Sequence, residues 1–157
     1  MHTLLPKEYL TFANGEPIFP QVLEPNGIQF VVYGVPQPQG STRAFMRPGM
    51  KFPIVTSDNP KNKPWRQETA SCAMIAMSGK PVWEGAVSLT VDFYFDRPKA
   101  QKKALYKTTK PDVDKLVRSI ADALTGIVFG DDARVVQMTC RKAYGSPARA
   151  EIQVREL

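Results

Sequence analysis

Residues 86–95, AVSLTVDFYF, restrict the fold of this chain more than any other segment. Apolar and polar side chains alternate along the segment, with Val87, Leu89, Val91, Phe93 and Phe95 on one side and Ser88, Thr90, Asp92 and Tyr94 on the other. A period of two residues is typical of a β-strand that packs one face against a core. The chain is therefore expected to build its core on a sheet.

Other segments supply the remaining layers of the predicted fold. Residues 28–34, IQFVVYG, form a short apolar run, and residues 134–145 and 149–157 alternate, so all three are predicted strands. A helix is expected from about Pro64 until Gly79 ends it, whereas the proline- and glycine-rich residues 35–52 predict an irregular loop. Trp65 and Trp83 are expected to pack in the core or an interface rather than to stack on a base. The order of elements indicates an α/β (α+β) fold with a mixed or antiparallel sheet and packed helices.

The length of the chain favours one domain. With 157 residues, 43% of them hydrophobic, the chain can bury one sizeable core. Residues 1–27 carry no sustained period and read as an N-terminal arm, which leaves residues 28–157 as the folded domain. No segment resembles a membrane span or a secretory signal, so a soluble, intracellular protein is expected. Cys72 and Cys140 are far apart and lack metal-ligand spacing, which argues against a zinc site or a disulfide framework.

Residues 110–132, KPDVDKLVRSIADALTGIVFGDD, contain most of the aspartates of the chain. The Lys110-Pro111 pair disfavours helix before the proline, so a helix is predicted to begin near Asp112 to Asp114 and to end at Gly126. The apolar side of this helix would carry Leu116, Val117, Ile120, Ala121 and Leu124. Asp112 and Asp114 therefore fall in the first turn, where carboxylates stabilise a helix.

A metal site is the alternative interpretation of these carboxylates. A turn at Gly130 could return Asp131 or Asp132 towards Asp112 and Asp114, and converging carboxylates need a counter-charge. Oxygen ligands alone favour Mg²⁺ or Mn²⁺. Along one ridge of the helix, Asp114, Arg118 and Asp122 follow at intervals of four residues. This ridge fits an exposed ion-pair ladder, although Asp122 could also bind a second metal.

The charge of the chain indicates a polyanionic partner. The net charge is +6, and residues 97–110, RPKAQKKALYKTTK, contain no acidic residue. A metal site next to such a surface suits phosphodiester hydrolysis. Candidate DNA contacts are Arg43, Arg47, Lys102, Lys103, Lys107, Lys110 and Lys142.

The segment KPDVDKLVRSIADALTGIVFGDDARVVQMTCRKAYG resembles the core of the RusA-like family of Holliday junction resolvases, whose pattern is K-P-D-x-D-N-L, D-A-L-N-G and D-D-x-Q-V. Upstream, YGVPQPQGSTR is similar to the family segment G-x-P-x-P-K-G-R-x-R. Lys115 stands where the family has Asn, Arg118 where lysine is typical, and Gln39 where Lys is expected.

The resemblance implies a homodimeric, Mg²⁺-dependent endodeoxyribonuclease that cuts four-way DNA junctions symmetrically in recombination and repair. Such enzymes are often encoded by phages and prophages and act in the cytoplasm of the bacterial or infected host cell. The metal-binding carboxylates of the family fall on Asp112, Asp114 and Asp132, and its essential basic residue falls on Arg118.

Two other function classes fit parts of the sequence. A non-catalytic protein that binds branched DNA would use the same basic surface without metal. A nucleotide-sugar transferase also holds a metal diphosphate with a DxD motif, but the chain offers little room for two substrate sites and shows no Rossmann fingerprint.

Overall fold

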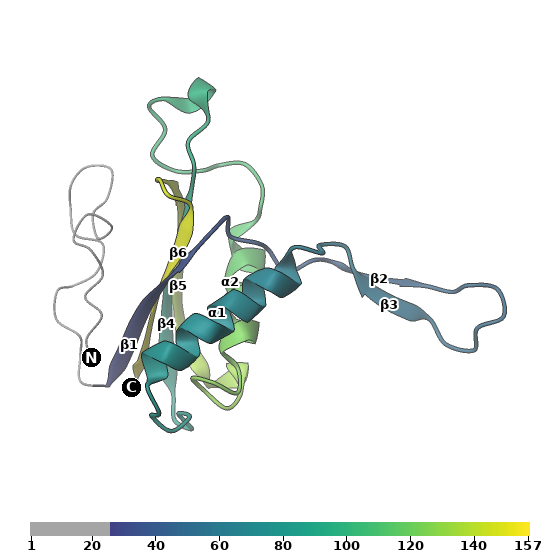
Figure 1. Cartoon of the computed structure of the whole chain (residues 1–157), viewed down its shortest axis with the longest axis horizontal. Helices are drawn as coiled ribbons and strands as arrows, with labels where there is room; N and C mark the ends of the chain where they lie inside the picture. Colours follow the sequence, from purple (N-terminus) through teal and green to yellow (C-terminus); the bar gives the residue numbers. More distant parts are fainter. Residues whose placement is uncertain (1–25) are drawn as a thin grey trace.

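A four-stranded mixed sheet forms the centre of the fold in the computed structural model, which describes residues 26–157 (Figure 1). Its strands are β1 (Gly27–Tyr33), β4 (Val87–Phe95), β5 (Val135–Tyr144) and β6 (Arg149–Glu156), in the order β1-β6-β4-β5. β6 pairs antiparallel with β1 and β4, and β5 pairs parallel with β4. The predicted strands and the mixed sheet are confirmed. The predicted arm, residues 1–27, lies almost wholly outside the described residues.

Two helices, α1 (Asn62–Met77) and α2 (Val113–Leu124), cover one face of this sheet (Figure 1). The side of β4 predicted to be apolar packs against them, as do the inward residues of β6 and β1. Trp65 and Trp83 are both buried in this core, as expected. α2 ends two residues before Gly126, whose φ of 81° few other residues adopt easily. Both helix predictions are therefore confirmed to within two residues.

The opposite face of the sheet carries buried charges that alternation alone did not reveal. Asp92 lies directly between Arg141 of β5 and Glu151 of β6 in the strand register. Arg141 donates two hydrogen bonds to the Asp92 carboxylate, and Arg149 Nε lies 2.7 Å from Glu151 Oε1. Burial raises the pKa of Glu151 to about 7, despite the opposing effect of Arg149. The side of β4 predicted to be polar is thus largely buried at its C-terminal end.

Residues 35–52, predicted as an irregular loop, are irregular except for one strand of a β-hairpin. Strands β2 (Thr42–Phe45) and β3 (Ile54–Ser57) pair antiparallel and project away from the sheet (Figure 1). The hairpin buries little apolar surface, since Phe52 is 79% exposed and Val55 is 61% exposed. Four-residue strands without a buried face show no alternation in the sequence, so the prediction of a loop was wrong for Thr42–Phe45.

A second projection lies between β4 and α2. Residues 96–111 leave the end of β4 and contain the short 3-10 helix η2 (Lys99–Gln101) before they reach α2 (Figure 1). The N-terminal end of α2 therefore follows directly from this basic segment. A further 3-10 helix, η3 (Asp132–Arg134), precedes β5. Within residues 26–157, no helix combines the length and apolar character required to cross a membrane.

Candidate metal and nucleic-acid site

Asp112 occupies the N-cap position of α2 without capping the helix. Its backbone is extended (φ −72°, ψ 138°), as is typical of an N-cap residue, but its side chain makes no hydrogen bond to the first-turn N–H groups. An N-cap Asp that used its carboxylate in this way would stabilise the helix by about 1 kcal/mol. The exposed Asp112 carboxylate is therefore available to bind a ligand.

Asp114 lies in the first turn of α2, beside the C-terminal half of β5. Cys140, which is half-buried on β5, lies near Asp114. Burial raises the pKa of the Cys140 thiol, and the charges of Asp114 and Asp92 raise it further. Asp112 and Asp114 thus share one end of α2, next to β5.

Lys142 fastens the segment before α2 to this strand. Its Nζ donates to the carbonyl oxygens of Thr109 (2.7 Å) and Pro111 (2.6 Å). Burial lowers the pKa of Lys142, and the charge of Lys107 lowers it further, whereas Asp112 acts in the opposite direction. Two of the three N–H donors of Lys142 therefore hold the backbone of the residues that precede Asp112.

The loop between β1 and β2 is held against both helices. Asn59 Nδ2 and Asn62 Nδ2 donate to the Pro38 carbonyl oxygen at 2.9 and 3.1 Å. Gln39 donates twice to α2, from its backbone N to the Lys115 carbonyl oxygen and from Nε2 to Asp122 Oδ2 at 2.8 Å. These bonds fix the loop along α2, between Lys115 and Asp122.

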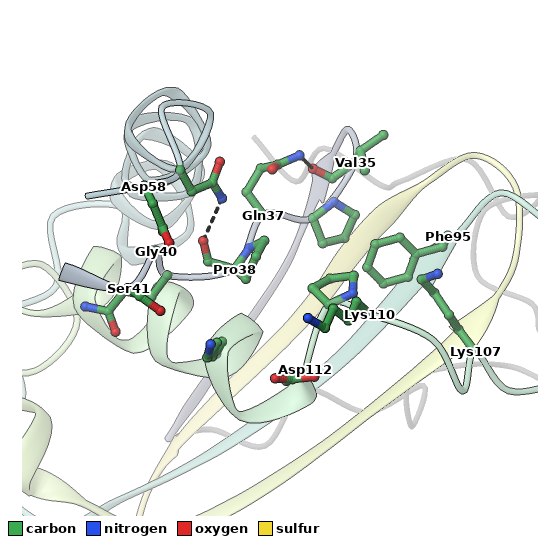
Figure 2. A pocket seen from close by; sticks show the side chains of 15 residues that line it. Val35, Gln37, Pro38, Gly40, Ser41, Asp58, Phe95, Lys107, Lys110 and Asp112 are labelled. Carbon is green, nitrogen blue, oxygen red and sulfur yellow. Dashed lines mark hydrogen bonds between the residues drawn. The ribbon is translucent and has the colours of Figure 1, made fainter. Parts of the chain in front are cut away.

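A pocket of about 620 Å³ lies between this loop and the segment that leads into α2. Figure 2 shows Gln37 and Pro38 on the side of the loop and Lys110 and Asp112 on the side of the helix. Phe95 and Lys107 lie towards one end. The Asp112 carboxylate therefore borders a cavity with both apolar and cationic walls.

The acidic pair Asp131 and Asp132 lies at the other end of α2. β5 runs back along the helix, so its first residue, Val135, lies about 17 Å along the strand from Cys140, and Asp132 precedes Val135 by three residues. Asp131 accepts a hydrogen bond from Ala133 N, while Asp132 begins η3 and is exposed. Among residues 26–157, no three His, Cys, Asp or Glu side chains gather closely enough to hold a metal ion. One chain therefore does not bring Asp112, Asp114 and Asp132 together.

Arg118 is exposed one turn after Asp114 on α2. The ion-pair ladder expected along this ridge is absent from the described residues, whose ion pairs are Glu84–Arg134, Asp92–Arg141 and Glu151–Arg149. Asp122 accepts its hydrogen bond from Gln39 instead. Within the described part of the chain, the Arg118 guanidinium therefore forms no ion pair with Asp114 or Asp122.

The remaining predicted DNA contacts lie on the two projections. Arg43 lies on β2, and Arg47 follows it with its guanidinium 5.9 Å from the Phe45 ring centre. Lys102 and Lys103 are exposed beyond η2. Lys110 lines the pocket, as does Lys107, whose Nζ lies 5.4 Å from the centre of the Phe95 ring.

The polar residues that fix the loop were missed in the sequence. Asn59 and Asn62 carry no motif, and Gln39 drew attention only as a departure from the family pattern. The buried position of Asn62 beside Ser119, to which it donates at 2.6 Å, depends on the packing of α1 against α2. No local pattern in the sequence signals such a contact.

Comparisons with known proteins identify the family of this chain. The family model "Endodeoxyribonuclease RusA" matches residues 34–155. "Uncharacterized protein YqaN" of Bacillus subtilis (strain 168) is 34% identical over 143 residues, which cover 83% of this chain and 96% of that protein. "Crossover junction endodeoxyribonuclease rusA" of Lactococcus phage r1t is 26% identical over 72 residues, 45% of this chain and 55% of that protein. The chain therefore belongs to the RusA endodeoxyribonuclease family.

Proposed function

We propose that this protein is a Mg²⁺-dependent endodeoxyribonuclease that resolves four-way DNA junctions by symmetric incision. The observation that carries the proposal is the start of α2, where the Asp112 carboxylate is left uncommitted beside Asp114. This end of α2 follows a basic projection and shares a pocket with the base of the hairpin. Carboxylates that border cationic surfaces on two sides suit a phosphate backbone as substrate.

The donor atoms at this site fit a hard divalent cation. Asp112 and Asp114 supply carboxylate oxygens, which favour Mg²⁺, with Mn²⁺ as a substitute. Asp132 would complete the set as the third carboxylate. When bound, such an ion supplies Lewis-acid stabilisation of the negative charge that develops on a phosphate during hydrolysis.

The basic side chains would hold the DNA backbone around this site. Arg43 and Arg47 on the hairpin, and Lys102 and Lys103 on the other projection, would contact phosphates away from the cut. Lys107 and Lys110 lie closer to Asp112. Arg118 would stabilise the additional charge of the transition state, because its guanidinium stays protonated and grips phosphate oxygens in pairs.

The position of Asp132 supports a homodimer. Because α2 and β5 run in opposite directions, Asp132 lies at the far end of the helix from Asp112 and Asp114. A second chain related by a two-fold axis could place its Asp132 at this site. Each chain would then supply Asp132 to the site of its partner. The same two-fold axis would match a four-way junction and produce paired incisions.

The biological setting follows from this activity. Junction cleavage belongs to DNA recombination and repair, in the cytoplasm where the DNA substrate lies. The nuclease domain would comprise residues 28–157, with residues 1–27 as an arm outside it.

The proposal is tested with Asp114→Asn and a labelled synthetic four-way junction. Loss of one carboxylate should lower incision by orders of magnitude, while junction binding stays equal or becomes tighter because a negative charge near phosphate is removed. Glu68→Gln on the exposed side of α1 makes the same change in net charge and should cut like the parent. Parental incision by Asp114→Asn would overturn the metal site. Tight binding without incision in any Mg²⁺ or Mn²⁺ buffer would favour a non-catalytic junction-binding protein.

The shared site is tested by mixing two inactive variants, Asp114→Asn and Asp132→Asn. In a mixed dimer, one site would contain both substitutions, and the other would contain neither. We therefore expect nicking activity to return when the two variants are unfolded and refolded together. Each mixed dimer would have one intact site, about half of the number in the parent dimer. If each chain built its own complete site, both sites of a mixed dimer would lack a carboxylate and no activity would return.

A further inference from the structure

We propose that the pocket beside Asp112 binds one unstacked nucleobase at the branch point of the DNA. This inference rests on the proposed function, because it requires branched DNA as the substrate. The pocket lies between residues 35–41 and residues 107–115, with Asp112 at its border (Figure 2).

Apolar rings supply the walls. Pro36 and Pro38 line the pocket from the loop, Pro111 lines it from the segment before α2, and Phe95 lies at the end of β4. Phe95, which is 7% exposed, closes this end of the pocket, and the puckered proline rings offer apolar surfaces that any base can contact. The ammonium group of Lys107 covers part of the Phe95 ring and can contact the edge of a base or an adjacent phosphate.

Polar groups at the other end can contact the edge of a base. Ser41 and Asp58 lie at the end opposite Phe95 (Figure 2), and Gln37 lies on the side of the loop. A hydroxyl, an amide and a carboxylate offer both donors and acceptors, which a base edge requires. Lys110 and Lys115 lie at the border that Asp112 shares, where the phosphates on either side of an inserted nucleotide would pass.

The pocket has the size and rigidity for this ligand. Its volume of about 620 Å³ falls within the range of about 300–1,000 Å³ that is usual for sites of small organic ligands. Four hydrogen bonds hold its loop wall: two from Asn59 and Asn62 to the Pro38 carbonyl, and two from Gln39 to α2. A wall fixed in this way loses little conformational entropy when a ligand binds.

Branched DNA offers such a base at low cost. Extrusion from a duplex requires a few kcal/mol of unstacking and unpairing, and the cost is smallest where a base already lacks a paired or stacked neighbour. The branch point of a four-way junction interrupts the stack. A pocket at the border of the cleavage site would therefore favour junctions over linear duplex and would align one backbone position with Asp112.

The test is a scan of abasic nucleotides through the branch point of a synthetic junction, with binding measured in EDTA and incision measured separately in Mg²⁺. The pocket is narrowed with the double variant Gln37→Leu/Ser41→Leu, whose leucines fill space without offering a ring. The matched control Gln67→Leu/Ser71→Leu makes the same two changes on exposed residues of α1. Circular dichroism and thermal unfolding establish that each variant folds.

We expect one position at the branch point where loss of the base weakens binding by the parent and the control by about 5- to 150-fold, the range of one stacked base. The pocket variant should show less than about a twofold effect at that position. Equal sensitivity of the pocket variant and the parent, or no sensitive position in any protein, would overturn the pocket. Absence of incision by the parent in Mg²⁺, with the base effect retained, would overturn the proposed nuclease activity and support the pocket.

Discussion

Replacement of Lys142 by Met separates two roles for the same side chain. The basic pattern predicts a phosphate contact, whereas the structure occupies its ammonium group with the carbonyl oxygens of Thr109 and Pro111. A positioning role predicts a loss of stability without a change in the salt dependence of DNA binding. A phosphate contact predicts the reverse.

The expected loss follows from the two bonds. A hydrogen bond to a charged group contributes about 1.5–3 kcal/mol when it is buried. The bond to Pro111 is partly buried and the bond to Thr109 is exposed, so water replaces part of what is removed. We therefore expect Lys142→Met to lower the free energy of unfolding by about 1–3 kcal/mol in total.

Urea unfolding and junction binding at several salt concentrations measure the two quantities. The control Lys103→Met removes an exposed charge on the projection after β4. It should leave stability within about 0.5 kcal/mol and reduce the slope of log K against log salt by about 1. An unchanged unfolding free energy for Lys142→Met, together with a slope reduced by about 1, would refute the positioning role.

Three other perturbations give separate tests. Because burial raises the pKa of Glu151 from its usual 4.5 to about 7, the folded state retains a proton that the unfolded state has lost between these pH values, so stability should fall as pH rises from about 5 to 7. In urea unfolding across this range, the free energy of unfolding of Glu151→Gln should depend less on pH than that of the parent. An identical pH dependence would contradict the raised pKa of Glu151. Gln39→Ala removes the 2.8 Å bond to Asp122, and unfolding should become easier by about 1–2 kcal/mol; no change would show that this bond does not hold the loop. Arg47→Gln on the projecting hairpin should lower the salt slope of junction binding by about 1 at constant stability, unless the hairpin does not touch DNA.

The sheet and its helices were predictable because burial repeats along the chain with the period of each element. β4 alternates and α2 carries an apolar stripe bounded by Pro111 and Gly126, so local sequence determines both. The hairpin was missed since its strands contact each other rather than the core, as the exposure of Phe52 and Val55 indicates.

The candidate site was predictable in part. The position of Asp112 and Asp114 at the start of α2 follows from the proline and the apolar stripe. The separation of Asp132 from them was not foreseen, because it depends on β5 pairing parallel with β4 and running back along α2. The pairing of Asp122 with Gln39, rather than with Arg118, likewise depends on a contact between residues 83 positions apart.

Incision of a four-way junction labelled in turn on each strand, beside linear duplex of the same sequence, tests the proposed function most directly. With Mg²⁺ and the full chain, we expect nicks at symmetric positions in two opposing strands of the junction, none in EDTA, and little cleavage of the duplex. Junction DNA that stays intact in Mg²⁺ and Mn²⁺, or a duplex cut as rapidly as the junction, would contradict the assignment.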